Sequence, residues 1–462
     1  MGNTKDLLHQ ALEQHQAGNL TDAEAIYLKI YKENPQLVDV LFLLGTLYLQ
    51  SGNPEASVTF LQKAITLKPD HVEAHNNLGT AFQNCGNLND AVESYKCAIN
   101  LAPDYAEAFY NLGSIFNKQR KFDMALEHYK QAISFSPDDY EAHLNIGNTF
   151  KELGKPEEAE KSYRRSAALK PDCAAVHSRL GIILQEQSKF DESIKSFKRA
   201  ISLDPTNADI HNNLGIALTK QGNLDEAVES YKSAIKLKPE EYQVYSNLAS
   251  VFKESGRQEE ALVCCNKAIE LNPDYAEANN NLGTILQETN QLEKAIVYYK
   301  KAIDLKPDNP EFYSNLGSAL KELDMLDEAA EYCRRAIMLN PDYAEAYNNL
   351  GTVLQDGSNL DEAITNYKQA IKHNPNHARA HSNLGTTLQE QGNTEEAVSH
   401  CRQSIALNPD CAELHNNLGG ILHKQERIEE AITCYDRAIE LDPENAEAHL
   451  NRSFALLLTG NY

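Results

Sequence analysis

The sequence lacks what marks a nucleic-acid-binding, membrane-spanning or secreted protein. Basic residues are the minority, 43 Lys and Arg against 67 Asp and Glu, and the formal net charge of -24 disfavours a phosphate-binding surface. No apolar stretch approaches the length of a membrane span, and the N-terminal MGNTKDLLHQALEQ has no apolar segment typical of a secretory signal. We therefore expect no nucleic acid and no membrane among the partners. A cytoplasmic location is expected, or a nuclear one if the protein is eukaryotic.

Motifs for chemistry are missing as well. The sequence has no glycine-rich phosphate loop, no nucleophile elbow and no spaced Cys/His set for zinc. His373, His377 and His381 are four residues apart, but Pro375 interrupts any helix that they could share. We therefore predict no catalytic residue, no metal site and no cofactor, and expect that this chain is not itself an enzyme. Tryptophan, a common interface anchor, is also absent, which leaves open whether the protein forms homo-oligomers.

Glycine and proline recur at one constant step along the chain, and no insertion disturbs the register. The glycines stand at Gly45, Gly79, Gly113, Gly147, Gly181, Gly215, Gly283, Gly317, Gly351, Gly385 and Gly419, with Ala249 in the one gap. The prolines stand at Pro35, Pro69, Pro103, Pro137, Pro171, Pro205, Pro239, Pro273, Pro307, Pro341, Pro375, Pro409 and Pro443. Such a period indicates a repeat architecture.

Each unit contains two helical patterns. The first, such as AEANNNLGTILQET at 276–289, is short and ends before a turn. The second, such as QLEKAIVYYKKAIDLKP at 291–307, has apolar residues at helical spacing, and the periodic proline ends it. Asp274 and Glu277 have the spacing of a capping box for the first helix, and Asn87 and Asn359 occupy the corresponding place before second helices. Capping would then explain much of the acidic excess.

Small residues are expected where the two helices of a unit meet. Gly283 on the first helix and Ala295 on the second would let the helix axes approach closely. Cys265, Cys333 and Cys401 share a repeat position with tyrosines such as Tyr299, so these thiols should fill core space in the reduced state. A redox site is disfavoured because no C-x-x-C occurs.

Small residues at the eighth and twentieth positions and proline at the thirty-second resemble the tetratricopeptide repeat (TPR). The resemblance implies an all-α fold, a right-handed TPR α-solenoid or superhelix of 34-residue helix–turn–helix repeats, whose first helices line the concave side. We expect a single array over residues 1–462. Thirteen full repeats would occupy residues 4–445 and start at 4, 38, 72, 106, 140, 174, 208, 242, 276, 310, 344, 378 and 412. A partial, truncated repeat would follow at 446–462.

A second series lies two residues before each periodic glycine. It comprises Asn77, Asn111, Asn145, Asn213, Asn247, Asn281, Asn315, Asn349, Asn383, Asn417 and Asn451, and is called here the asparagine ladder; only Leu43 and Arg179 depart from it. These amides could satisfy backbone groups at the junction with the next repeat. Alternatively, they could bind a guest, because a carboxamide both donates and accepts. Helices packed about 8–10 Å apart would then present one amide to roughly every third residue of an extended peptide. We predict that the ladder binds peptide backbone.

Other positions on the first helices refine this prediction. Thr284, Ser318, Gln287 and Gln355 suggest a neutral, polar groove floor. The second repeat position is mostly acidic, as at Glu345, which argues against a cationic clamp for a C-terminal carboxylate.

The ladder together with repeats of the form AEAxxNLG is similar to the N-terminal TPR domain of the protein O-linked N-acetylglucosamine transferases and to bacterial TPR-glycosyltransferase proteins. In that family the ladder holds extended protein substrates. The first hypothesis is therefore a scaffold that binds extended or disordered protein segments. The second is the substrate-recruiting part of such a glycosyltransferase, whose catalytic domain is missing from this chain. The third is an assembly platform that uses its convex face or its ends.

Overall fold

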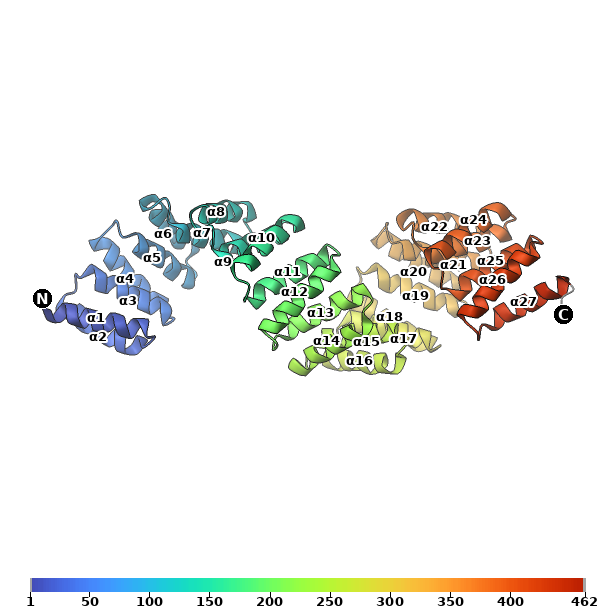
Figure 1. Ribbon diagram of the computed structural model, residues 1–462, viewed down its shortest axis with the longest axis horizontal. Helices are drawn as coiled ribbons and strands as arrows, with labels where there is room; N and C mark the ends of the chain where they lie inside the picture. The colour runs from blue at the N-terminus through green and yellow to red at the C-terminus, as the bar shows by residue number, and fades with distance from the viewer. Residues whose placement is uncertain (1, 460–462) are drawn as a thin grey trace. The chain divides into compact units, whose positions relative to one another are not determined.

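The computed structural model describes residues 2–459, which form 27 α-helices and no strand (Figure 1). The first helices of successive pairs are α1 (Gly2–Gln16), α3 (Val38–Gln50), α5 (Val72–Asn84), α7 (Ala106–Lys118), α9 (Tyr140–Glu152), α11 (Ala174–Glu186), α13 (Ala208–Gln221), α15 (Tyr242–Glu254), α17 (Ala276–Glu288), α19 (Pro310–Glu322), α21 (Ala344–Asp356), α23 (Ala378–Glu390), α25 (Ala412–Lys424) and α27 (Ala446–Thr459). Residues 1 and 460–462, which the expected array includes, lie outside the described residues.

The second helices end close to the periodic prolines. They are α2 (Leu20–Glu33), α4 (Pro54–Leu67), α6 (Leu88–Leu101), α8 (Phe122–Phe135), α10 (Pro156–Leu169), α12 (Phe190–Leu203), α14 (Leu224–Leu237), α16 (Gln258–Leu271), α18 (Leu292–Leu305), α20 (Leu326–Leu339), α22 (Leu360–His373), α24 (Thr394–Leu407) and α26 (Ile428–Leu441). The predicted all-α architecture of helix–turn–helix repeats is confirmed.

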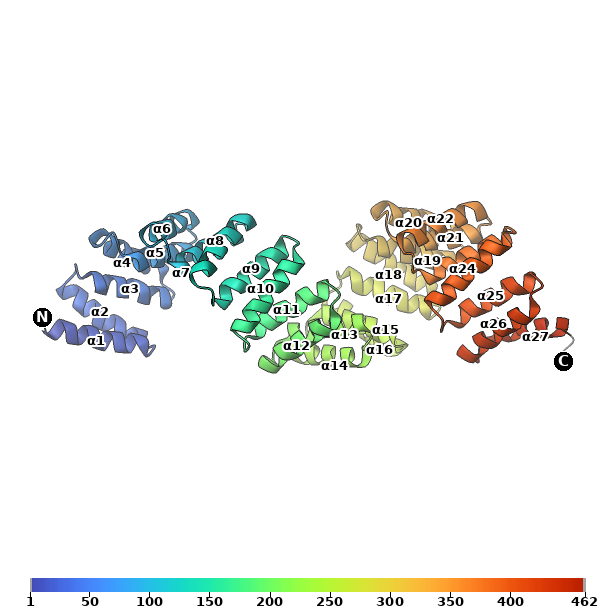
Figure 2. The ribbon, with the colours of Figure 1, turned by 45° about the horizontal axis from the view of Figure 1, so that its top comes forward.

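The chain divides into two compact units, residues 1–226 (unit 1) and 227–462 (unit 2), with the division inside α14. In both units the helices follow one another in chain order (Figure 2). In unit 2 each first helix from α15 to α27 contacts the next first helix, whereas consecutive second helices make no comparable contact. The first helices of unit 2 therefore form one continuous layer.

The two helices of a pair meet at the periodic glycine. A Cβ atom added to Gly283 would lie 2.7 Å from Cε1 of Tyr299, whose side chain is fully buried. The predicted close approach is confirmed, but the nearest neighbour is the tyrosine ring and not Ala295. Ser57 and Ser193 replace the partner alanine in two pairs, and each donates a hydrogen bond of 2.7 Å to the carbonyl oxygen of the facing glycine.

The capping-box prediction is wrong. The helix α17 begins after Tyr275, one residue later than expected, and no side chain caps it. The Asn272 Oδ1 atom instead accepts from the Asp274 amide at 3.1 Å, so the residue before the periodic proline organises the turn. Neither Asn87 nor Asn359 makes a side-chain cap bond. Side-chain caps do occur at α4, α9, α13, α19, α23 and α27, from the residue directly before each helix.

The turn inside each pair needs a left-handed residue at one fixed position. Glycine supplies it in seven repeats, including Gly392 at φ 90°. Six repeats place another residue there, including Glu426 at φ 62°, which costs conformational energy because of its Cβ atom. This second glycine series is hard to recognise in the sequence because the six exceptions interrupt it.

The substitution Glu426→Gly should raise the free energy of unfolding by about 0.5–1 kcal/mol, because it relieves this strain at an exposed position. Urea unfolding of the full chain would measure it. The reverse change, Gly392→Glu, is the matched control and should destabilise. Loss of stability in Glu426→Gly would contradict the strain argument.

Histidines that recur at one position of the first helices bond to the preceding turn. In seven repeats the Nε2 atom donates to the carbonyl oxygen of the proline six residues earlier, at 2.8–3.2 Å. Tyr245 and Tyr313 make the equivalent bond through their hydroxyl groups, at 3.2 and 3.0 Å. His and Tyr at this position therefore make the same bond.

Candidate peptide-binding groove

All eleven ladder asparagines lie in the middle of first helices, and each is partly exposed. The ladder residues Asn77, Asn111, Asn145 and Asn213 belong to unit 1, and the other seven belong to unit 2. An asparagine on the core-facing side of the helix would instead be buried, as Asn279 is at 0% exposure. The exposed place of Arg179 on α11 corresponds to a ladder position.

The Nδ2 atoms of most ladder asparagines bond to the preceding repeat. In eight of them the acceptor is the side chain 35 residues earlier, at 2.8–3.1 Å: Asn111 to Asn76, Asn145 to Tyr110, Asn281 to Ser246, Asn315 to Asn280, Asn349 to Ser314, Asn383 to Asn348, Asn417 to Ser382 and Asn451 to Asn416. Asn77 donates instead to the Thr46 hydroxyl at 3.1 Å. The amides therefore do join repeats, but through side chains of the preceding repeat and not through backbone groups of the next.

The acceptors are the residues directly before the preceding ladder position. They are mostly Asn or Ser, and those in unit 2 are buried, such as Ser314 at 0% and Asn348 at 4% exposure. The sequence carries a signal for this series, because Asn and Ser alternate there from one repeat to the next between Asn212 and Asn416. The sequence does not show, however, that these residues lie opposite the ladder asparagines of the next first helix.

The oxygen atoms of these amides remain available in several repeats. Within the described part of the chain, Oδ1 of Asn281, Asn315 and Asn383 accepts no recorded hydrogen bond, while Nδ2 of each is engaged. The Oδ1 of Asn349 differs, since it accepts from Asn348 at 3.4 Å. An amide held by its nitrogen with a free oxygen is a preoriented acceptor for a guest N–H group.

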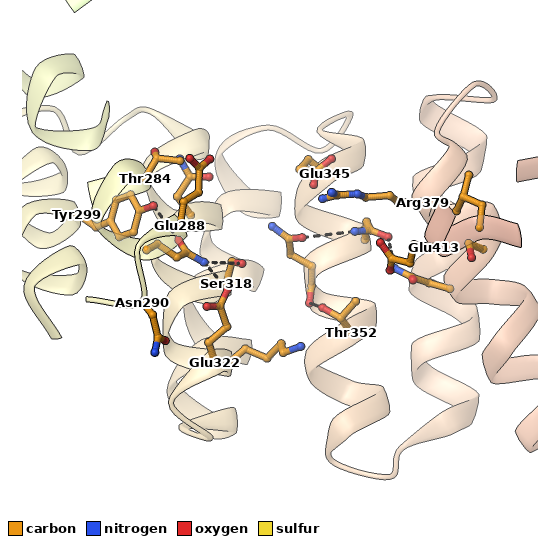
Figure 3. A pocket seen from close by; sticks show the side chains of 18 residues that line it. Thr284, Glu288, Asn290, Tyr299, Ser318, Glu322, Glu345, Thr352, Arg379 and Glu413 are labelled. Carbon is orange, nitrogen blue, oxygen red and sulfur yellow. Dashed lines mark hydrogen bonds between the residues drawn. The ribbon is translucent and has the colours of Figure 1, made fainter. Parts of the chain in front are cut away.

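A groove of about 760 Å³ follows the first helices of unit 2 from α17 to α25 (Figure 3). Three ladder residues, Asn315, Asn349 and Asn383, line it. Hydroxyl and amide side chains complete much of the floor, including Thr284, Ser318, Thr352 and Gln287. The structure thus brings consecutive ladder positions to one polar groove.

The groove is less neutral than the sequence suggested. Glu288, Glu322, Glu345 and Glu413 line it, against two cations, Lys321 and Arg379. Lys321 pairs with Asp356 at 3.1 Å, and Glu322 accepts from the Gln287 amide at 2.6 Å. Glu345 accepts from His377 Nε2 at 2.8 Å, and this hydrogen bond lowers the pKa of the Glu345 carboxyl despite its partial burial.

The remaining sequence predictions concern cysteines, metals and membranes. Cys265, Cys333 and Cys401 are fully buried and free, as expected for core-filling thiols. Among residues 2–459 no group of three potential metal-ligating side chains occurs. None of the helices in this part of the chain combines the length and apolar character needed to cross a lipid bilayer.

Solved structures with a similar course of the chain include the APC/C hetero-tetramer Cut9–Hcn1, with a TM-score of 0.50 and 16% identity over 99% of this chain and 97% of that one. Yeast Tom70 follows with a TM-score of 0.45 and 19% identity over 92% and 96%. MamA has a TM-score of 0.36 and 26% identity over 37% and 94%. At so low an identity, the likeness to Cut9–Hcn1 concerns the fold alone.

Comparison with protein families is more decisive. Among curated protein sequences, none is significantly similar to this chain. A TPR repeat model matches residues 45–86. The model of the C-terminal domain of cilia and flagella-associated protein 70, itself a TPR domain, matches residues 70–280 and again 242–454. Because these two matches together cover more than half of the chain, the protein belongs to the TPR family that this model describes.

Proposed function

We propose that the protein is a protein-interaction scaffold that binds extended or disordered polypeptide segments through the asparagine ladder. The observation that carries the proposal is the different use of the two amide atoms in residues such as Asn315 and Asn383. Their nitrogen atoms bond to the preceding repeat, and their oxygen atoms, which accept no bond from residues 2–459, are left at the groove. Contacts to backbone N–H groups recognise an extended chain with little demand on its side chains. The amides of unit 1 that are held in the same way, such as Asn111, would bind similarly.

The test must separate guest binding from the structural bond, because removing a ladder asparagine removes both. The variant Asn281→Ala/Asn417→Ala deletes two amides and their bonds to Ser246 and Ser382. The matched control, Ser246→Ala/Ser382→Ala, deletes the same two bonds from the other end and keeps both amides.

The probe is a fluorescent, unstructured peptide that contains only Gly, Ser, Thr and Gln and is long enough to span several ladder positions. It is titrated with the full chain and followed by anisotropy. We expect the ladder variant to weaken binding about ten-fold, since each net hydrogen bond contributes about 0.5–1.5 kcal/mol. The serine control should bind as the wild type does. No binding to the wild type, or equal weakening in the two variants, would refute the proposal.

A second candidate follows from the similarity to the O-linked N-acetylglucosamine transferases: the array recruits protein substrates to a glycosyltransferase domain. The same groove would serve, and the AEAxxNLG repeats around Asn281 and Asn349 favour it. A longer reading frame that encodes such a domain would support this candidate. A complete gene without one would leave the scaffold function alone.

A further inference from the structure

One arginine interrupts the acidic series at the second position of the first helices. In unit 2, α15 has Gln243 at this position, and the first helices from α17 to α27 hold Glu277, Glu311, Glu345, Glu413 and Glu447. Among these later helices α23 alone carries a cation there, Arg379, and it has no acidic residue in its first turn. A cation near a helix N-terminus is unfavourable, because the helix dipole is positive at that end. Arg379 therefore does not serve the stability of its own helix.

Among residues 2–459 the guanidinium group of Arg379 has no ion-pair partner. The side chain is exposed, and none of the hydrogen bonds or ion pairs recorded among residues 2–459 involves it. Figure 3 shows it reaching along the groove toward Glu345. That carboxylate is engaged by His377 at 2.8 Å, and the pKa of Glu345 is lowered first by this bond and only to a lesser extent by the charge of Arg379. The other cation of the groove, Lys321, is paired with Asp356.

The surroundings of Arg379 define where a guest would meet it. It lines the same groove as Asn349 and Asn383, the ladder residues of the preceding repeat and of its own. Glu345 and Glu413 occupy the equivalent position in the repeats before and after it, and both line the groove. An anionic group is thus attracted at one repeat and repelled at its two neighbours, which is how a charge pattern fixes register.

We propose that Arg379 binds an anionic side chain of the extended segment held in the unit 2 groove, either an Asp or Glu carboxylate or the phosphate of a phosphorylated residue. This inference rests on the proposed function and specifies its substrate class. The planar guanidinium donates two parallel hydrogen bonds to such a group. The guest anion also supplies the negative charge that the first turn of α23 lacks. Segments with one anion at this register are bound in preference to neutral ones.

The test uses the full chain and four versions of the same Gly/Ser/Thr/Gln peptide, whose central residue is Ser, Asp, phosphoserine or Lys. The wild type should bind the Asp peptide about five-fold more tightly than the Ser peptide, the range of a partly exposed charge-assisted bond. Arg379→Gln should remove this preference, and Arg379→Glu should reverse it in favour of the Lys peptide. The preference should weaken as salt is added.

Lys300→Gln is the matched control, because it removes one positive charge from the exposed surface of α18, outside the groove lining. It should leave the preference for Asp unchanged. If the phosphoserine peptide binds more tightly than the Ser peptide and the Asp peptide does not, the guest is a phosphorylated segment. If both bind more tightly, any anionic side chain is accepted.

An anion preference that survives Arg379→Gln, or no anion preference in the wild type, would overturn the inference. The neutral Ser peptide tests the scaffold function independently of Arg379. If that peptide binds and the ladder variant weakens it, the scaffold function stands even where the role of Arg379 fails.

Discussion

Replacing Gly283 with alanine should lower the free energy of unfolding by about 2 kcal/mol, although alanine is the better helix former. The new Cβ atom would lie 2.7 Å from Cε1 and 2.8 Å from Cδ1 of Tyr299. The ring is fully buried, and its hydroxyl donates to Gln287 Oε1 at 2.8 Å, so it has little freedom to move aside. Urea unfolding of the full chain would measure the change.

The control is the same substitution at Gly420, the neighbour of a periodic glycine on α25. A Cβ atom there meets nothing within 4 Å. Gly420→Ala should therefore be neutral or raise the free energy of unfolding by up to about 1 kcal/mol. If both substitutions changed stability in the same direction and to the same extent, the steric role of Gly283 would be wrong.

One repeat of the chain has alanine in place of the periodic glycine and a smaller residue in place of the facing tyrosine. At Ala249 the periodic glycine is missing, and the residue opposite, sixteen positions later, is Cys265 where most repeats have tyrosine. Both are fully buried. A cysteine can therefore face an alanine, but its thiol must turn aside. At Gly317 and Gly385 an added Cβ atom would lie within 2.5 Å of the Sγ atoms of Cys333 and Cys401, and a single sulfur atom rotates away more easily than a buried ring. Gly283→Ala should accordingly cost less in a Tyr299→Cys background, with a coupling of about 1–2 kcal/mol in the double-mutant cycle. Strict additivity would contradict this.

The fold was predictable because its determinants are periodic and steric. Glycine, proline and the buried tyrosine position recur at a constant step, so every repeat supports the same assignment of helices and turns. Helix starts were predicted less well, since Asp274 has the spacing of a capping residue but lies one residue too early. In the structure the turn is stabilised by the residue before the proline, such as Asn272. The spacing of acidic residues along the sequence does not indicate which of these two residues makes the bond.

The candidate site was predictable only in part. The positions of the ladder follow from the repeat, but the use of each Nδ2 atom does not, because its acceptor lies 35 residues earlier and is Asn, Ser or Tyr in different repeats. The acidic lining was missed for a similar reason. Glu288 and Glu322 lie at the ends of first helices, and only the stacking of α17 and α19 brings them to the groove.

Thiol labelling should divide the cysteines by repeat position, with a difference on the order of a thousand-fold in rate. Cys97 is exposed, whereas Cys265, Cys333 and Cys401 are fully buried at the tyrosine position. Burial raises the pKa of each of these three thiols to about 12, so little thiolate forms near neutral pH even where reagent enters. Labelling with iodoacetamide, followed by peptide mass spectrometry, should modify Cys97 in the native chain and the buried three only in urea.

The labelling rates of the buried cysteines also show how the helix pairs of the array open. Repeats contact only their neighbours, so a single pair can open without global unfolding. If Cys333 and Cys401 react at one common slow rate, unit 2 opens cooperatively, and if their rates differ, the pairs open one by one. Either result keeps these thiols as core residues. Native labelling of Cys333 as fast as that of Cys97 would contradict this role, because a side chain packed against Gly317 can be reached only after α19 and α20 separate.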